Sequence, residues 1–244
     1  MSKGKVIFLY SCSGLAEKPF LDAGYECYSF DGQNKDTDDG LWHKRFAWFS
    51  SDNVEQQAAK IIEQVGDGVK LVIGFPPCDD LAVSGSRHFA RKLAQNPLCQ
   101  IEATERAKLV EAVGNAAKCS WCAENPRSVL STLWRKPNFR FHPYEYGQYL
   151  PVDDVHPLYP EIINPRDAYP KETYLWSGNG FTLPVKKPVQ PPCNPDGTVA
   201  YSEQYKKLGG KSLRTKNIRS ATPRGFAIAL CEQLESDRCT TKEP

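Results

Sequence analysis

Short apolar runs separated by helix-like stretches limit the fold of this chain more than any other feature. Four runs have the length and composition of buried strands, and three helical stretches lie between them. The runs are 6–10, 25–30, 69–75 and 119–123, and the helical stretches are 15–23, 54–65 and 98–117. This alternation predicts an α/β fold, because parallel strands need a crossover connection between them. We expect a mostly parallel sheet with helices on both faces.

The amino-acid composition of the chain changes after residue 135. Prolines and aromatic residues become frequent, which predicts a loop-rich region, with one more strand at 174–176. The amphipathic stretch 223–234 predicts a last helix that packs back on the sheet. We therefore expect an α/β core over 1–135, a loop-rich region with a small target-recognition part over 136–212, and a returning C-terminal helix over 213–244. The length of 244 residues suits one large domain.

Composition narrows the cellular setting. No apolar run approaches the roughly 20 residues that span a bilayer, and the N-terminus does not have the pattern of a signal peptide. We expect no membrane partner and a cytoplasmic location, with a monomer as the simplest state. The nine cysteines are odd in number and irregularly spaced, so reduced thiols are expected rather than disulfides.

Basic residues are concentrated near the C-terminus, although the net charge is only +2. No acid interrupts this set: Lys206, Lys207, Lys211, Arg214, Lys216, Arg219 and Arg224. Such a surplus suits contact with phosphates of a nucleic acid. A solvated basic loop with no partner is the alternative.

Ligands of parallel sheets bind beyond the carboxyl ends of the strands, so the residues after each run are the candidates. A glycine-containing turn at 11–14, followed by Asp31 after the second run, is typical of a site for a nucleoside-bearing cofactor. The glycine lets the backbone approach the ligand, and the acid accepts hydrogen bonds from ribose hydroxyls. The turn is not G-x-G-x-x-G. This favours a cofactor without a pyrophosphate, such as S-adenosylmethionine.

Cys78 follows the third run behind a rigid Pro76-Pro77 pair, and Glu124 follows the fourth. A reactive thiol needs a nearby cation, and His88 or the basic segment is a candidate; a buried structural cysteine is the alternative. Burying a glutamate costs free energy unless its carboxyl group has a hydrogen-bond partner, so a buried glutamate without one suggests a functional role. The two residues form a chemical pair. A thiolate that attacks C6 of cytosine, with a carboxyl group at N3, turns C5 into a nucleophile.

These residues, in this order, resemble the motifs of the cytosine-C5 DNA methyltransferase family, particularly its compact phage and prophage members. The matching segments are Leu9–Leu15, Phe30-Asp31, Gly74–Cys78, Glu124-Asn125-Pro126, Tyr169–Trp176 and Arg219–Phe226. The chain differs from the family at Cys12 or Ser13 in place of a glycine, at Asp79 and at Pro126, and it lacks the Gln-x-Arg-x-Arg motif.

The resemblance implies a Rossmann-like class I S-adenosylmethionine-dependent methyltransferase fold with a small loop-rich insertion. Cys78 would be the nucleophile, Glu124 would protonate N3, and Asn125 and Pro126 would shape the base pocket. Lys171 is the basic residue of the later segment expected to contact the substrate. The expected cofactor-binding residues are Tyr10, Ser11, Cys12, Ser13, Gly14, Leu15, Asp31, Asp52, Pro76, Ala221 and Thr222. The substrate would be double-stranded DNA with the target cytosine flipped out, and the loop 79–89 would close behind it around Gly85.

Two other functions stay open. The same chemistry on RNA or a free nucleotide is one, and a catalytically silent nucleic-acid-binding relative is the other. A metal site is not expected. Cys119-x-x-Cys122 lacks a second spaced pair, and His43, His88, His142 and His156 share no ligand spacing. We interpret the aromatic residues between Trp134 and Tyr149 as a local core, with base stacking as the alternative.

Overall fold

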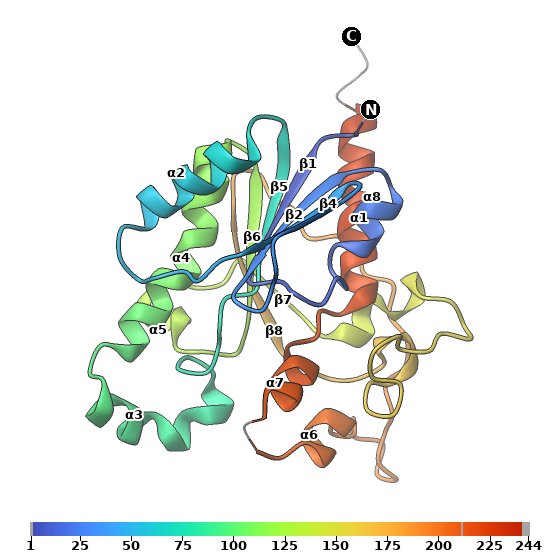
Figure 1. Ribbon diagram of the computed structural model, residues 1–244. Helices are drawn as coiled ribbons and strands as arrows, with labels where there is room; N and C mark the ends of the chain where they lie inside the picture. Colours follow the sequence, from blue (N-terminus) through green and yellow to red (C-terminus); the bar gives the residue numbers. More distant parts are fainter. Residues whose placement is uncertain (1, 211, 241–244) are drawn as a thin grey trace. The chain divides into compact units, whose positions relative to one another are not determined.

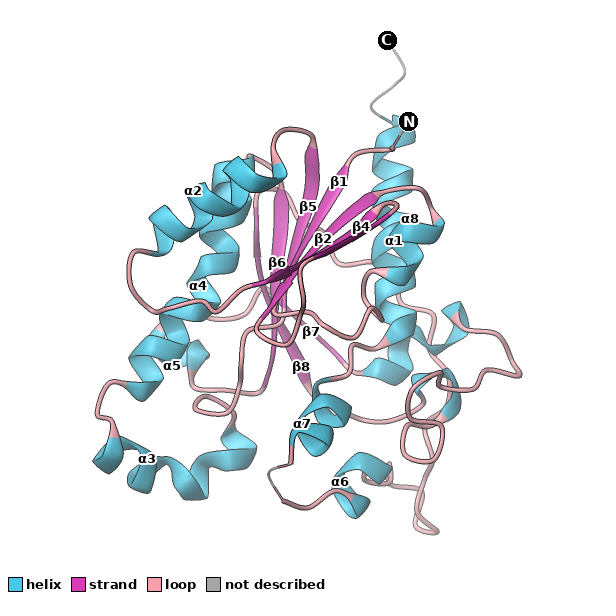
Figure 2. Ribbon diagram, viewed as in Figure 1, coloured by secondary structure: helices cyan, strands magenta, loops and turns pink. Residues whose placement is uncertain are grey.

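The computed structural model describes residues 2–210 and 212–240, so Lys211 of the basic segment lies outside the described residues. The described chain is α/β (Figures 1 and 2), as the alternating pattern predicted. It divides into two compact units. The first holds the described residues up to Cys12, Phe20–Arg140 and Thr173–Thr182. The second holds Ser13–Pro19, Phe141–Glu172 and the chain from Leu183 onward.

One mixed sheet of eight strands dominates the architecture. Its order is β3-β4-β2-β1-β5-β6-β8-β7. The strands are β1 (Lys5–Leu9), β2 (Glu26–Asp31), β3 (Thr37–Asp39), β4 (Trp42–Phe46), β5 (Val69–Gly74), β6 (Ser120–Pro126), β7 (Phe139–Phe141) and β8 (Thr173–Gly178). The five strands from β4 to β6 in this order run parallel, whereas β3 and β8 are antiparallel to their neighbours β4 and β6.

Burial explains why these strands form the centre of the first unit. In β1 the four residues from Val6 to Leu9 are fully buried, so this strand needs cover on both faces. Helices α2 (Val54–Val65) and α4 (Cys99–Ala117) lie together on one face (Figure 1). The buried residues of α2 recur every three or four positions, which gives the helix one apolar side. On the other face Phe8 packs against Phe20, with ring centroids 5.5 Å apart.

The remaining helices are short except for the last. They are α1 (Lys18–Asp22), α3 (Phe89–Gln95), α5 (Leu130–Leu133), α6 (Glu203–Lys207), α7 (Leu213–Ser220), α8 (Arg224–Thr240) and the 3-10 helices η1 (Val83–His88), η2 (Pro143–Tyr149) and η3 (Pro165–Asp167). No helix in the described ranges is long and apolar enough to cross a membrane.

Most predicted elements are confirmed, with their ends moved by a few residues. The helix at 54–65 is confirmed at both ends, and the strand at 174–176 is confirmed as the longer β8. Two expectations differ. The loop expected over 79–89 contains η1, and the first helix starts at Lys18 rather than at 15, because Pro19 has no N–H to donate to the Leu15 carbonyl. Sequence reasoning missed the β3–β4 hairpin and the short helices.

The second unit is built around α8 and the segments 141–172 and 183–220. Phe141, Tyr146 and Phe226 form a buried aromatic cluster with one stacked and two edge contacts. The local core expected for the aromatics between Trp134 and Tyr149 is confirmed for Phe141 and Tyr146, whereas Trp134 packs with Trp121 and Trp176 in the first unit. From residue 182 to 201 the chain, all of it described, has no regular helix or strand. The packing of α8 on the sheet stays a prediction. The division of the sequence into a core over 1–135, a loop-rich region over 136–212 and a C-terminal helix over 213–244 also stays a prediction.

Arg224 opens α8 within a buried ion network. Its guanidinium donates to both carboxylate oxygens of Asp154, at 2.7 and 2.6 Å, and to Asp167 at 3.2 Å. Asp167 also accepts from the Arg224 and Gly225 backbone N–H groups, so it stabilises the start of the helix. Burial raises the pKa of Asp154, but the hydrogen bonds from Arg224 and from Arg166 N–H, together with the charge of Arg224, outweigh burial and the pKa is lowered. Arg224 is therefore a structural cation and not part of the exposed basic surplus.

Candidate functional site

The strand order reverses direction between β1 and β5, and this is where an open parallel sheet offers a crevice. Leu9 pairs with Gly74, and Gly74 pairs with Ala123. The segments after β1 and β5 and the last residues of β6 therefore meet at one edge of the sheet. Three predicted site segments lie at this edge, all within the first unit: Tyr10–Cys12, Pro76–Cys78 and Glu124-Asn125.

The Cys78 loop is fixed to the end of β6 by a set of hydrogen bonds. The Asn125 side-chain amide donates to the Pro76 carbonyl at 3.0 Å, and both groups are buried. Cys78 then starts a turn, since its carbonyl accepts from Leu81 and Ala82 N–H at 3.0 and 2.9 Å. Cys78 itself is partly exposed. The cysteine is thus held on a rigid turn with access to solvent.

Beyond the turn, the chain after Cys78 pairs with the chain after Glu124. Val83 N–H donates to the Arg127 carbonyl and Val129 N–H to the Leu81 carbonyl, both at 3.0 Å. The residues between them, Ala82 and Ser128, form an antiparallel bridge. The two loops therefore form one structural unit, which the sequence motifs did not indicate.

Two buried polar atoms beside this unit have no hydrogen-bond partner within residues 2–210 and 212–240. They are Asn125 Oδ1 and Ser128 Oγ. A buried polar group without a partner costs free energy on the order of 1–3 kcal/mol, so such atoms are places where a polar ligand would gain most. Glu124, next to Asn125, has only 9 % of its surface exposed. The charge of Glu124 adds to burial in raising the pKa of Cys122.

The loop after β1 is strained at its first residue. Tyr10 has a φ of +60°, which is unusual for a residue with a side chain. Its N–H donates to the Phe30 carbonyl at 2.7 Å, and its hydroxyl donates to the Arg106 carbonyl at 2.8 Å. Burial raises the pKa of the Tyr10 hydroxyl, opposed by the charge of Arg106. The hydrogen bonds of the Tyr10 backbone N–H and of its hydroxyl hold the residue in this strained conformation. Strained residues of this kind are common at ligand sites.

Asp31 ends β2 beside this loop. Burial raises the pKa of its carboxyl group, opposed by a 2.7 Å hydrogen bond from Gln33 N–H. Asn34, which is buried, donates to the carbonyls of Ser11 and Ser29 and so ties the β1 loop to β2. Asn34 was missed from sequence, because an asparagine in a polar loop carries no signal of burial.

Trp48 is a second residue that sequence reasoning missed. Its side chain is 84 % exposed, yet its ring lies over Gly32, where an added Cβ would come within 2.5 Å of Trp48 Cε3. Ala47 N–H donates to the Asp31 carbonyl at 3.1 Å, so the tryptophan is held next to Asp31. An exposed tryptophan beside an acid suits a ligand that carries both a planar ring and hydroxyl groups.

Other predicted site residues are placed differently. Asp52 is exposed just before α2, in the first unit. Six belong to the second unit: Ser13, Gly14, Leu15, Lys171, Ala221 and Thr222. Within that unit Leu15 and Ala221 share one buried cluster with Ile163, Tyr169 and Ile218. The end of the first loop and the closing motif are therefore in contact, whereas the structure does not test where they lie relative to Cys78.

Cys119, Cys122 and His43 belong to the residue types that bind metals. Burial raises the pKa of the Cys119 thiol to about 11 and also raises that of Cys122, whereas zinc binds thiolates. His43 contacts Asp38 at 2.6 Å and Glu26 at 3.1 Å on the β3–β4 edge. Among the described residues no group of three metal-ligating side chains has suitable geometry.

No protein-family model matches the chain, and no curated protein is significantly similar to it.

Proposed function

We propose that the protein is an S-adenosylmethionine-dependent methyltransferase that modifies C5 of cytosine in nucleic acid through Cys78. The observation that supports this function best is the joining of the two loops that carry the chemistry. Asn125 donates to the Pro76 carbonyl, and residues 81–83 pair with 127–129. A nucleophile and a buried acid on one rigid unit, at the crevice of the sheet, suit covalent catalysis on a planar base.

The residues around β1 and β2 fit S-adenosylmethionine better than a dinucleotide. Helix α1 has only five residues and starts at Lys18, nine positions after Leu9, so its N-terminus does not follow β1 directly as it would in a turn that holds a pyrophosphate. Asp31 would accept from the ribose hydroxyls, and Trp48 would contact the adenine ring. The antiparallel β8 also departs from the all-parallel dinucleotide fold. The sheet is compatible with the class I methyltransferase fold that the sequence resemblance implies.

The cytosine fits the polar atoms next to Cys78. Its exocyclic amino group is a donor and N3 is an acceptor, and Asn125 Oδ1 is a buried acceptor that has no partner among the described residues. Glu124, protonated, would donate to N3. These groups lie on a strand end, which holds them more firmly than a loop would.

The chain's own residues would act in a defined order. The Cys78 thiolate forms a bond to C6 while Glu124 gives its proton to N3, which makes C5 electron-rich. S-adenosylmethionine, when bound, supplies an electrophilic methyl group. Loss of the C5 proton to a base then breaks the bond between sulfur and C6, and Glu124 recovers the N3 proton.

Trapping of the covalent adduct tests this function. The protein is incubated with labelled S-adenosylmethionine and DNA or RNA that contains 5-fluorocytosine, because fluorine blocks the loss that would release Cys78. We expect a band that survives a denaturing gel. Cys78→Ala should remove the band and leave the thermal midpoint of unfolding unchanged, since the thiol is partly exposed.

Cys193→Ala is the matched control, because Cys193 is an exposed free thiol outside the proposed site; it should keep the adduct. An adduct that persists in Cys78→Ala, or methyl transfer at the wild-type rate from that variant, would refute the mechanism.

A further inference from the structure

Two exposed tyrosines form a stacked pair at the start of α6. The side chains of Tyr201 and Tyr205 are 69 % and 66 % exposed, with ring centroids 4.9 Å apart and planes 26° apart. Ser202 caps the helix by accepting from Tyr205 N–H at 3.2 Å. The cap holds the turn between Tyr201 and Tyr205, so the two rings keep their stacked arrangement while their outer faces are exposed to solvent. Exposed paired aromatics of this kind commonly serve as contact sites for planar ligands.

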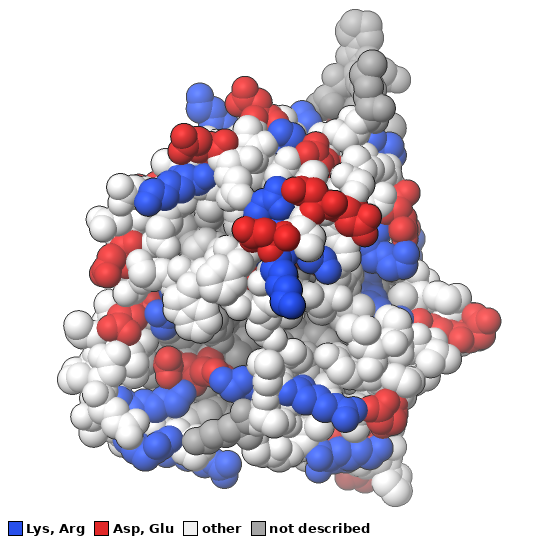
Figure 3. Space-filling model, viewed as in Figure 1, with Lys and Arg blue, Asp and Glu red and all other residues white. Residues whose placement is uncertain are grey.

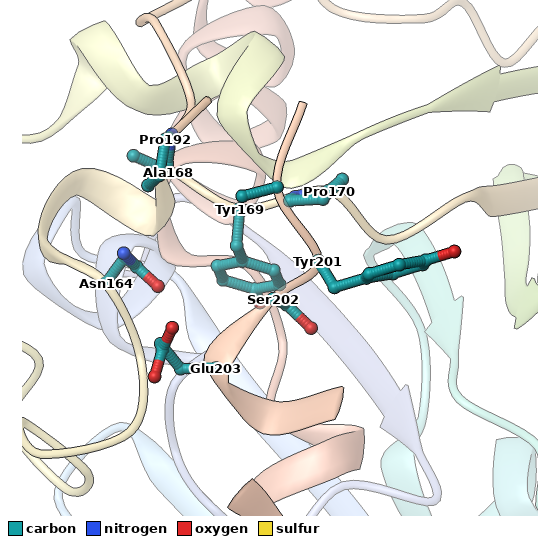
Figure 4. A pocket seen from close by; sticks show the side chains of 9 residues that line it. Asn164, Ala168, Tyr169, Pro170, Pro192, Tyr201, Ser202 and Glu203 are labelled. Carbon is teal, nitrogen blue, oxygen red and sulfur yellow. The ribbon is translucent and has the colours of Figure 1, made fainter. Parts of the chain in front are cut away.

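The cavity beneath Tyr201 does not explain why the ring is exposed. Its lining includes Asn164, Tyr169, Pro170 and Glu203, and it has room for about one water molecule. Figure 4 shows Tyr201 turned away from the other labelled side chains, with its hydroxyl at the far end. The space below the pair is too small for a base, so any ring-stacking ligand must lie on the outer faces.

Exposed cations follow the tyrosines along the chain. They are Lys206, Lys207, Arg214, Lys216 and Arg219, and no acid occurs from 204 to 220. Helix α7 turns Thr215 and Ile218 inward, so its cations face solvent. Figure 3 shows Lys and Arg side chains gathered over α6 and α7.

Nearby acids offset part of this charge. Glu203 pairs with Lys206 and Lys207 at 3.1 and 3.0 Å, and Glu161 pairs with Arg214 at 2.9 Å. These pairs are solvent-exposed and therefore weak. A phosphate can replace either carboxylate at small cost, so Lys206, Lys207 and Arg214 remain available to a polyanion. Arg219 donates to the Leu208 carbonyl at 2.9 Å and keeps its charge exposed.

We propose that helices α6 and α7, together with Tyr201, bind single-stranded nucleic acid, with a base stacked on the Tyr201–Tyr205 pair and phosphates on the cations of the two helices. In a duplex each base face is covered by its neighbours, and only an unpaired base offers its face to a protein ring. Rings next to cations are the combination that binds single strands without sequence preference. This surface extends the proposed function by defining the strand state of its substrate, but the binding itself does not depend on methyl transfer.

Binding of labelled 12-nucleotide strands, measured by fluorescence anisotropy without cofactor, tests the inference. The probes are single-stranded DNA, single-stranded RNA and the DNA duplex of the same sequence, all with Cys78→Ala protein. We expect tighter binding of a single strand than of the duplex, and the two single-stranded probes show whether the 2′-hydroxyl matters. The double variant Y201L/Y205L should weaken single-strand binding roughly 5-fold to 150-fold, which corresponds to about 1–3 kcal/mol for one stacked base.

Three controls separate stacking from other effects. Y201F/Y205F keeps both rings and should bind within about 2-fold of the parent. Val152→Ala, at a side chain of the same unit that is 85 % exposed, should change nothing. Lys216→Gln with Arg219→Gln should lower the slope of log affinity against log salt by roughly 1.4, since each phosphate contact contributes about 0.7.

Equal affinity of Y201L/Y205L and its parent, tighter binding of the duplex, or no binding of any probe would overturn the inference. The proposed function is judged separately by the 5-fluorocytosine adduct. A protein that forms the adduct but ignores the tyrosine changes retains the proposed function and loses this binding surface, and the opposite pair of results retains only the surface.

Discussion

Replacing Gly74 with alanine should destabilise the first unit through a single contact. A Cβ at Gly74 would lie 2.2 Å from Val110 Cγ2 and 3.0 Å from Cγ1, both on α4. Gly74 and Val110 are buried, and α4 packs on β5, so neither side can move away cheaply. We expect Gly74→Ala to lower the free energy of unfolding by roughly 1–3 kcal/mol, the usual range for an overpacked core.

A second substitution makes the test specific. Val110→Ala removes both clashing methyl groups and should by itself cost about 2 kcal/mol. In Gly74→Ala/Val110→Ala the new methyl occupies part of that space, so the double variant should be no less stable than Val110→Ala alone. The coupling energy would then be about 1–3 kcal/mol. Urea unfolding followed by circular dichroism measures all four proteins, and losses that simply add would refute the close approach.

Two further predictions concern a buried histidine and an exposed tryptophan. Burial, and then the charge of Arg224, lower the pKa of His156 to about 4 from 6.5. The unfolded chain thus binds more protons between these values, and stability falls as pH falls from about 6.5 to about 4. His156→Asn keeps an acceptor for Leu158 and Tyr159 N–H and should flatten this part of a urea-midpoint profile; an unchanged slope would contradict the assignment. Trp48→Ala should weaken S-adenosylmethionine binding about 2-fold to 12-fold by calorimetry, with no change in unfolding, whereas Trp48→Phe should lose less; equal affinity in all three would exclude the ring from the site.

Local patterns were enough to predict the centre of the sheet. The run at 69–75 and the helix at 54–65 have the apolar spacing of buried elements, and each lies where the spacing indicated. The hairpin β3–β4 has no such pattern, because its strands are charged and half-exposed. Ion pairs such as that of Arg45 with Asp38, at 2.7 Å, help hold it together.

Contacts between distant residues explain what the sequence could not predict at the site. Motif order placed Cys78 and Glu124 after neighbouring strands, but the pairing of 81–83 with 127–129 depends on backbone groups that any residue carries. From the sequence alone, Arg224 is placed with the basic residues expected to contact phosphates. Its carboxylate partners lie 70 and 57 positions earlier, with no local sign of the ion network.

The division of the chain into units has a practical consequence for anyone who wants to work with one of them. The chain passes from one unit to the other after Cys12, Pro19, Arg140, Glu172 and Thr182. Neither unit is a contiguous stretch of sequence, so no truncation from either end releases one of them on its own. A gene product shortened after Thr182 would keep every segment of the first unit together with an incomplete second unit, and one shortened further would lack parts of both. A protease that cut at one crossing would leave fragments still interleaved by the others. Expression of either unit alone would require its segments to be rejoined in a new order with designed linkers.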